Sequence, residues 1–521
     1  MLRTPRHLFR LLKIARTLAR HGALEPFEAA LSGAGVAPAV IRAARLFARP
    51  LITVKGRPGE RLAAALVQLG PAFIKFGQML STRADLIGEQ NASDLSTLQD
   101  QLAPFPPAAA RATIEQELGR PVEELFLTFD DQPVSAASIA QVHLATIEPT
   151  DVIPNGEVAI KVLRPGIEAA LARDIDLLRW LAEMTERAQP RLRRLKPVEV
   201  VDTFAETVKT EMDLRLEAAA AAELAANFAQ DPTYLVPPID WRLTARRVMT
   251  QQRISGIPID DRDAILAGGH NIREVLSKAA AIFFNQVFRD GYFHGDQHPG
   301  NMFVDAEGRI GVVDFGIMGR LDRATRFYLA DMLLGFLNRD YRRVAEIHFD
   351  AGYVPPHQSL DSFAQACRSI GEPIFGRPLQ EISFARVLGQ LFQLAEGFEM
   401  EVQPQLLLLQ KNMLMAEGVS RRLDPELNTW TLAQPLIEVW MRENRGPEAR
   451  LKDALGDAVR IIRRLPYMAD RFEQLVTSVS REGVRVDPES LARAGQGPGR
   501  SAIWALWIAL AALAVLVLVK L

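Results

Sequence analysis

The spacing of apolar residues changes several times along this chain, and each change predicts a different kind of element. Helical periodicity runs through 60–80, and three prolines (Pro104, Pro106 and Pro107) then break the chain. Short β-rich runs predict strands at 134–146, 157–163, 233–239 and 246–254. Helical patterning covers about 168–229 and most of the chain from about 262, interrupted by one compact hairpin at 302–313. The pattern therefore predicts a mixed α/β unit followed by a helical one.

The N-terminal segment is basic and amphipathic. Residues 1–20 contain no acidic residue, and their basic residues recur every three or four positions beside several leucines. Two interpretations are open: a helix lying on an anionic membrane surface, and a cationic helix packed on its own domain. A secretory signal is excluded, because the apolar stretch is interrupted and no small-residue cleavage site follows it.

The C-terminal segment is apolar. Ala502 to Val519 contains no charged residue and is bracketed by Arg500 and Lys520. At about 1.5 Å per residue this run spans about 27 Å, which is just enough to cross a hydrocarbon core of about 30 Å. It predicts a transmembrane helix, with a buried C-terminal helix as the alternative. Positive charge on the protein side of the span favours a cytoplasmic body.

Composition narrows the class of protein further. The 521 residues are 48% apolar and carry 61 basic against 63 acidic side chains, which excludes a disordered chain and gives no nucleic-acid signature. The single cysteine, Cys367, cannot form an intrachain disulfide, which favours a reducing compartment. Only ten of the basic residues are lysines. Each lysine is therefore informative, because arginine cannot replace a compact point charge.

The segment from His294 to Gly316 has the pattern of a kinase catalytic loop. In protein kinases the form H-x-D-x-x-x-x-N precedes a short hairpin and D-F-G. Here Asp296 and Asn301 have that interval, and Asp314-Phe-Gly316 follows the predicted hairpin. The spacing predicts that Asp296 faces the transferring phosphate, while Asn301 and Asp314 converge on Mg²⁺.

The upstream half of a kinase site is also present. Lys161 ends the run Val158-Ala-Ile-Lys and corresponds to the strand lysine that grips the α- and β-phosphates of ATP. An alanine-rich loop stands where a glycine-rich phosphate loop belongs. It comprises Val134, Ser135, Ala136, Ala137, Ser138, Ile139, Ala140, Gln141 and Val142. Alanine allows fewer backbone angles than glycine, so this loop should be stiffer and approach phosphate differently.

Together these motifs resemble the UbiB/ADCK-type atypical kinases over about residues 55–445. The matching features are a K-x-G-Q motif, the alanine-rich loop, an E-x-D motif and a glutamate that pairs with the strand lysine. They fall at Lys75 and Gln78, at 135–141, at Glu211 and Asp213, and at Glu217. The stretch from Glu401 to Ser420 is similar to the family's C-terminal lobe.

The resemblance implies how these residues act. A helix is expected to cover the cleft and to insert Lys75 and Gln78 toward the phosphates, with Glu211 and Asp213 as acidic counterparts. The expected catalytic residues are Asp296, Lys161, Glu217 and Lys75. ATP is expected to contact the alanine-rich loop, Lys161, Gln78, Glu211 and Asp213, and Mg²⁺ to be held by Asn301 and Asp314.

The expected fold is α+β, helix-rich and protein-kinase-like, with two lobes, a family-specific N-terminal helical extension and a C-terminal transmembrane helix. The expected boundaries are 1–55 (basic segment), 56–110 (helical extension), 111–255 (N-lobe), 256–445 (C-lobe), 446–500 (amphipathic linker) and 501–521 (span). The resemblance implies ATPase or small-molecule or lipid kinase activity that supports ubiquinone biosynthesis at a bacterial inner membrane. Expected partners are ATP, anionic membrane lipid, prenylated phenol or quinone intermediates and ubiquinone-biosynthesis enzymes, and no nucleic acid.

Two alternatives remain open beside this prediction. His294, Asp296 and His298 alternate in a way that could form a hydrolytic metal site. A pseudoenzyme that binds nucleotide only to switch conformation, as a scaffold for quinone-biosynthesis enzymes, is the stronger alternative. An ordinary protein kinase is disfavoured, because no A-P-E motif follows Gly316 and residues 322–338 predict helix directly.

Overall fold

The computed structural model describes residues 3–23, 56–81, 87–95, 98, 102–188, 196–375, 394, 397–400, 403–427 and 429–445. Two units divide the chain, Met1–Trp440 and Met441–Leu521, and the first contains every predicted site residue. The predicted span at 502–519 and the amphipathic segment at 446–500 lie outside the described residues. Among the described helices, none is long and apolar enough to cross a bilayer.

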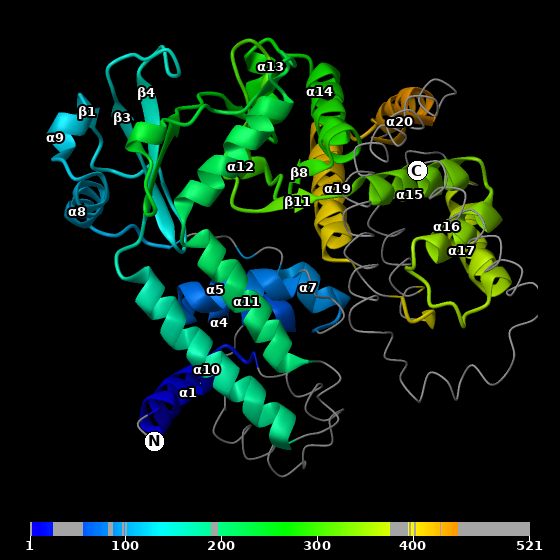
Figure 1. Cartoon of the computed structure of the whole chain (residues 1–521), viewed down its shortest axis with the longest axis horizontal. Coiled ribbons are helices and arrows are strands. Elements are labelled where there is room, and N and C mark those ends of the chain that lie inside the picture. Colours follow the sequence, from blue (N-terminus) through cyan, green and yellow to red (C-terminus); the bar gives the residue numbers. More distant parts are fainter. Residues whose placement is uncertain are drawn as a thin grey trace, which may run out of the picture. The chain divides into compact units, whose positions relative to one another are not determined.

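The first sheet is antiparallel, and Figure 1 shows its strands β1, β3 and β4. This sheet carries Lys161. Its order is β1-β3-β4-β6, and β2 pairs with β3. Its strands are β1 (Thr128–Phe129), β2 (Ser135–Ala136), β3 (Ala140–Thr146), β4 (Glu157–Leu163) and β6 (Val248–Gln252). Side chains of β4 alternate between faces: Val158 and Ile160 pack with α8 (Pro107–Leu118), and Leu163 faces the larger core. The predicted boundary at 110/111 therefore falls inside a helix that belongs with this sheet.

The second sheet contains the predicted hairpin. Its order is β5-β10-β9-β7, and β9 pairs antiparallel with β10, which confirms the hairpin at 302–313. The strands are β5 (Tyr234–Leu235), β7 (Ile257–Pro258), β9 (Met302–Val304) and β10 (Ile310–Val312), with a separate pair β8 (Tyr292–His294) and β11 (Met318–Arg320). The helices of this region are α13 (Arg262–Ala267), α14 (Ile272–Phe284), π-helical η3 (Asn285–Asp290), α15 (Arg323–Leu337), α16 (Tyr341–Asp350), α17 (Leu360–Phe375), α19 (Pro404–Leu423) and α20 (Thr429–Arg445).

The helical periodicity predicted through 60–80 is confirmed, and it is divided between two helices, α4 (Pro58–Leu69) and α5 (Pro71–Ser81). Gly70 separates them at a φ of 107°, a left-handed conformation that suits glycine, directly before a proline. Gly77 allows the two helices to approach closely. A Cβ at this position would lie 2.6 Å from the Cδ1 atoms of both Leu66 and Leu98.

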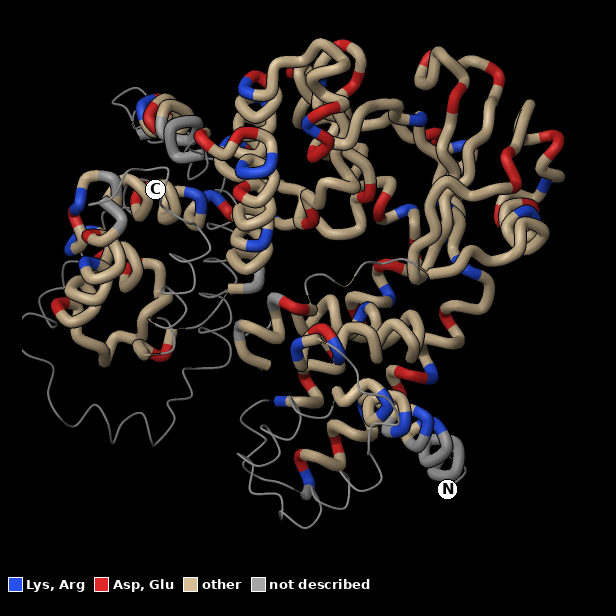
Figure 2. Tube along the Cα trace, turned by 180° about the vertical axis from the view of Figure 1, so that it is seen from behind, with Lys and Arg blue, Asp and Glu red and all other residues tan. Residues whose placement is uncertain are grey.

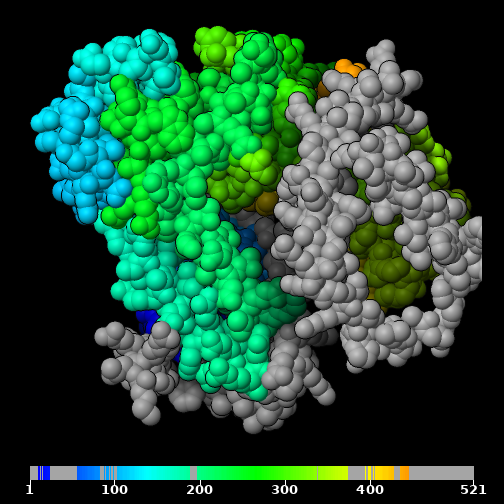
Figure 3. Space-filling model, in the orientation of Figure 1, coloured from blue at the N-terminus to red at the C-terminus, as the bar shows by residue number. Residues whose placement is uncertain are grey.

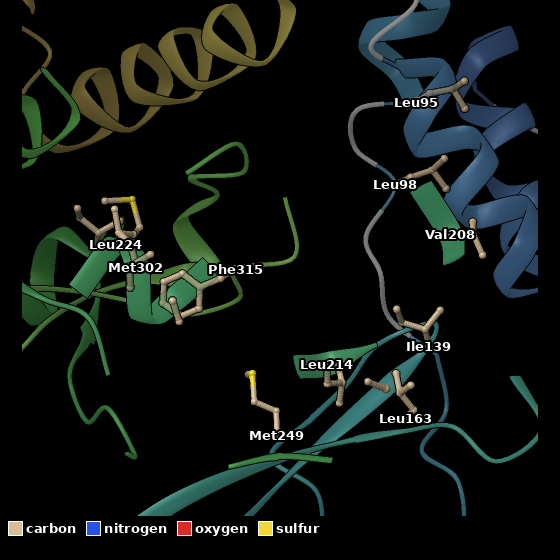
Figure 4. Packing of buried hydrophobic residues seen from close by; sticks show 14 of the residues in the cluster. Leu95, Leu98, Ile139, Leu163, Val208, Leu214, Leu224, Met249, Met302 and Phe315 are labelled. Carbon is tan, nitrogen blue, oxygen red and sulfur yellow. The ribbon is translucent and has the colours of Figure 1, made fainter. Parts of the chain in front are cut away.

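Two long helices join the N-terminal helices to the first sheet. α10 (Ile167–Ala188) and α11 (Pro197–Glu211) pack together and against α5, and α7 (Glu89–Leu95) packs on α4. Figure 3 shows the atoms of α10, α11 and α12 (Leu214–Asn227) forming a continuous surface on one side. One apolar core runs through both regions, since Leu98 and Val208 belong to the same cluster as Leu163 and Met249 (Figure 4).

The basic N-terminal helix, α1 (Arg3–Arg20), packs on its own domain. Figure 2 shows basic residues along the described part of this helix. Arg10 Nη2 lies 2.7 Å from Asp174 Oδ2 of α10, and its guanidinium lies 5.5 Å from the centre of the Phe73 ring. Ile14 is buried, whereas Lys13 is exposed. The packed interpretation therefore holds for the face that carries Arg10 and Ile14.

Candidate functional site

Lys161 lies at the centre of the candidate site. It pairs with Val142 on one neighbouring strand and with Met249 on the other, so its backbone is held on both sides. Its Nζ donates to Glu217 Oε1 of α12 at 2.6 Å and to Asp314 Oδ1 at 3.0 Å. Three segments distant in sequence therefore meet at one ammonium group.

The charged groups in this cluster shift one another's pKa values. Burial opposes the charge of Lys161, but Asp314 and Glu217 outweigh it and raise its pKa above the ordinary value. Lys161 holds the pKa of Asp314 well below its usual range, and the charge of Lys75 adds to the effect. Glu217 is the more deeply buried carboxyl, and burial raises its pKa although Lys161 opposes this. One cation shared by two carboxylates leaves a net negative cluster, which suits a divalent cation.

The backbone turn at Asp314 leaves its carboxylate exposed. Asp314 has a φ of 65°, in a left-handed region that aspartate tolerates better than most residues. Its side chain is 51% exposed, whereas the next residue, Phe315, is buried. Figure 4 shows Phe315 beside Leu224 and Met302. Burial of the phenylalanine thus anchors the turn that exposes the carboxylate.

The catalytic-loop segment is held by its own histidines. His294 is buried, its Nε2 donates to the Asp314 carbonyl at 2.7 Å, and its Nδ1 accepts from the Asp296 amide at 3.1 Å. Burial lowers the pKa of His294, which agrees with this neutral tautomer. His298 Nδ1 accepts from the Gly300 amide at 3.1 Å. The structure contradicts the hydrolytic metal site, because both ring nitrogens of His294 already bond to the chain and His298 caps its own turn.

The oxygen donors present fit Mg²⁺ bound together with a nucleotide. The Val313 amide donates to the Asn301 carbonyl at 2.9 Å, so Asn301 lies beside the residue that precedes Asp314. Asn301 Nδ2 donates to the Asp296 carbonyl at 3.2 Å, so a metal ion would have to use the amide oxygen of this side chain. Mg²⁺ commonly uses one or two protein ligands and completes its shell with phosphate and water. Within the described segments, no group of three or more His, Cys, Asp or Glu forms a protein-only metal cage.

The alanine-rich loop is a tight hairpin. The Ala137 amide donates to the Ala140 carbonyl at 2.8 Å, and β2 continues along β3. Arg164 Nη2 donates to the Ala137 carbonyl at 3.3 Å and supports the turn from behind. Ser138 and Ile139 are buried, so the turn packs into the core.

The two edges of this loop differ. Gln141 is fully buried, and its Oε1 accepts from the Phe105 amide at 3.0 Å. Its side chain is used inside the domain, while Val134 at the other edge is 57% exposed. The expected nucleotide contacts of these residues remain predictions.

The K-x-G-Q helix meets the E-x-D segment. Lys75 Nζ lies 3.1 Å from Glu211 Oε2, and both side chains are largely buried. Gln78 Nε2 donates to the Leu98 carbonyl at 3.5 Å. Asp213 caps α12 and bonds to Arg215 through both carboxylate oxygens, and this contact lowers the pKa of Asp213. The geometry therefore brings Lys75 and Glu211 together, while Asp213 acts at the start of the helix that carries Glu217.

Sequence reasoning assigned no role to three residues that hold the catalytic loop. Lys411 Nζ of α19 donates to Asp296 Oδ1 at 2.7 Å. Asn412 Nδ2 donates to the His294 carbonyl at 2.6 Å, and Gln286 Oε1 accepts from the His294 amide at 2.9 Å. The scarcity of lysine was the available signal for Lys411. Buried amides such as Asn412 and Gln286 leave no comparable mark in a sequence.

The fold is helix-rich α+β, and in the site Lys161 pairs with Glu217 and Asp314 while Lys411 pairs with Asp296. This fold and this arrangement define a kinase-like protein. A family model described as the ABC1 atypical kinase-like domain matches residues 97–348, and one described as the UbiB helical domain matches residues 367–428. The chain belongs to the UbiB family of ABC1 atypical kinase-like proteins.

Curated relatives agree with this family. Probable protein kinase UbiB of Marinobacter nauticus is 45% identical over 82% of this chain and 78% of its own length. The same-named protein of Vibrio vulnificus is 46% identical over 80% and 75%, and that of Azotobacter vinelandii is 43% identical over 81% and 78%. A solved structure of Rv3197 with erythromycin, from Mycobacterium tuberculosis, is 24% identical at a TM-score of 0.43 and covers 67% of this chain and 91% of that one.

Proposed function

We propose that this chain is a membrane-associated atypical kinase-like enzyme that hydrolyses ATP or transfers its γ-phosphoryl group to a small or lipidic acceptor. The observation that carries the proposal is the meeting of Lys161, Glu217 and Asp314 within hydrogen-bonding distance. A lysine that is held by a glutamate and faces a metal-binding aspartate is the arrangement that phosphoryl transfer requires.

Each residue of the candidate site has a distinct role in this proposal. Lys161 holds the α- and β-phosphates, and Glu217 orients Lys161. Asn301 and Asp314 hold Mg²⁺, which neutralises charge on the phosphates when it is bound. Asp296 orients the acceptor and receives its proton.

The helical extension favours a small acceptor over a protein. Lys75 and Glu211 form a largely buried pair, and the charge of Lys75 acts on Asp314. We infer that the K-x-G-Q helix lies close enough to Asp314 to take space that a peptide acceptor would need. The same observation also favours a second candidate, a nucleotide-switched pseudoenzyme in which the helix excludes every acceptor but the nucleotide still binds.

The membrane and pathway parts of the proposal rest on the sequence. The uncharged run at 502–519 supports a single C-terminal span in the bacterial inner membrane, with the catalytic body in the cytoplasm. The resemblance of the motifs to UbiB/ADCK-type kinases supports a role in ubiquinone biosynthesis. The proposed partners are anionic lipid, prenylated phenol or quinone intermediates and the enzymes that modify them.

ATP turnover by the purified full-length chain tests the proposal. It is measured with and without anionic liposomes and a phenolic quinone precursor, with Asp296→Asn as the inactive control. Phosphate release without a labelled acceptor supports an ATPase, and a labelled lipid or phenol supports a kinase. Nucleotide binding without ATP turnover under any condition overturns the proposed enzymatic activity and supports the pseudoenzyme.

A further inference from the structure

A lysine of the helical domain reaches the catalytic loop. Lys411 lies on α19, inside the segment that matches the UbiB helical domain. Its Nζ donates to Asp296 Oδ1 at 2.7 Å, and the two side chains are 28% and 33% exposed. Resting on the proposed phosphoryl transfer, we propose that Lys411 is a further catalytic residue, which contacts an oxygen of the transferring phosphoryl group and stabilises its negative charge.

The residue next to Lys411 fixes the register between α19 and the loop. Asn412 is buried, its Nδ2 donates to the His294 carbonyl at 2.6 Å, and its Oδ1 accepts from the Gln297 amide at 3.0 Å. These two bonds bracket Asp296 on both sides in sequence. Hydrogen bonds between a buried amide side chain and buried backbone groups are costly to break. The fold therefore holds Lys411 next to Asp296. This pair differs from a surface ion pair, which forms between two mobile side chains.

The identity of the residue fits a phosphate contact. Three of the ten lysines, Lys75, Lys161 and Lys411, pair with acids of this site in a chain whose 61 basic residues are mostly arginine. An ammonium group has three rotatable donors and is a compact charge. It can keep its bond to Asp296 and donate to a phosphoryl oxygen at the same time, whereas the planar arginine fork would favour both carboxylate oxygens.

The carboxylate can serve Lys411 and the acceptor together. Lys411 bonds to Oδ1, and a carboxylate has lone pairs on both oxygens, so the acceptor O–H can donate to the other. In the transfer step the acceptor oxygen bonds to the γ-phosphorus and its proton passes to Asp296. The bond from the γ-phosphorus to the β–γ bridging oxygen breaks, and ADP leaves with that electron pair. Negative charge lies on the transferring oxygens throughout, next to the position of Lys411.

Steady-state ATP turnover and Mg-ADP calorimetry on the purified full-length chain test this inference. Lys411→Met is expected to lower kcat by roughly 100- to 1000-fold, the loss typical when one preorganised charge-stabilising donor is removed. Mg-ADP affinity should stay at the wild-type value, because ADP lacks the transferring group. The thermal midpoint should also stay at the wild-type value. Lys411→Arg should recover part of kcat, since the charge is kept and only its shape changes.

A matched control lies on the same helix. Arg422 Nη1 bonds to Asp260 Oδ2 at 3.0 Å, and Arg422→Met removes an ion pair of α19 that involves no residue of 294–301. Its kcat should remain at the wild-type value. If Lys411→Met does not fold, Lys411→Gln is measured with the same expectation.

Two outcomes overturn the role of Lys411 while the proposed function stands: a folded Lys411→Met with wild-type kcat, or a loss of kcat that Mg-ADP affinity and the thermal midpoint follow in parallel. A wild-type chain that turns over no ATP overturns the proposed function, and the catalytic role of Lys411 with it.

Discussion

Replacing Lys161 with methionine tests whether the central cluster behaves as a buried charge network. The Lys161 and Glu217 side chains are 16% and 9% exposed, so Lys161→Met leaves Glu217 as a buried carboxylate without its cation. Removing one partner of such a pair costs about 3–5 kcal/mol in the free energy of unfolding. Asp314 adds little to this cost, because its half-exposed carboxylate can be solvated by water.

The cost should depend on pH, and its sign follows from Glu217. Burial raises the pKa of Glu217 while Lys161 lowers it, so removing Lys161 raises that pKa further. A carboxyl whose folded pKa exceeds its unfolded value contributes stability below the unfolded pKa, and this contribution is lost as pH rises through the folded pKa. The deficit of Lys161→Met should therefore be larger at about pH 8 than at about pH 5, because Glu217 takes up a proton as the pH falls.

Urea unfolding of the purified full-length chain measures this effect. Midpoints are compared for the wild type, Lys161→Met, Glu217→Gln and the double variant at both pH values. Because the glutamine is uncharged, the double variant should regain most of the stability lost in Lys161→Met. Equal deficits at the two pH values, together with no recovery in the double variant, would refute the reasoning.

Three further predictions address the nucleotide and the membrane. Asp314→Asn should abolish Mg-ATP binding while the thermal midpoint stays near the wild-type value, and unchanged affinity by calorimetry would contradict the metal assignment. Ala136→Gly or Ala137→Gly should alter the preference between ADP and ATP, because glycine loosens the tight hairpin of the loop. ADP and ATP affinities equal to those of the wild type would contradict this prediction. Deletion of 500–521 should release the chain from membranes in fractionation, unless the basic N-terminal helix is sufficient, and a double truncation separates these two results.

Much of the site could be predicted from sequence because its chemistry depends on short intervals. The interval from Asp296 to Asn301 and the hairpin before Asp314 are local, and the hairpin has the predicted strands. Lys161 could be placed on a strand by its β-rich run, and β4 contains it. Such features are encoded within a few residues, where backbone propensity and side-chain alternation decide the structure.

Other features could not be predicted, because they depend on contacts between distant segments. Helical spacing continues across Gly70, so periodicity alone does not show that a left-handed glycine divides the stretch into two helices. The basic stripe of α1 fits a lipid surface or a protein surface equally, and only the contact between Arg10 and Asp174 selects the packed face. Gln141 lies within a loop expected to bind nucleotide, yet its amide bonds to Phe105 inside the domain.

The sequence by itself determined the kinase-like class and the family. It also supplied the motif residues that we propose hold the phosphates and Mg²⁺. Tertiary structure decided which charges meet: Lys75 with Glu211, Lys161 with both Glu217 and Asp314, and Lys411 with Asp296. The physical reason is that a motif constrains neighbours along the chain, whereas the partner of a buried charge is set by whichever segment the hydrophobic core packs against it.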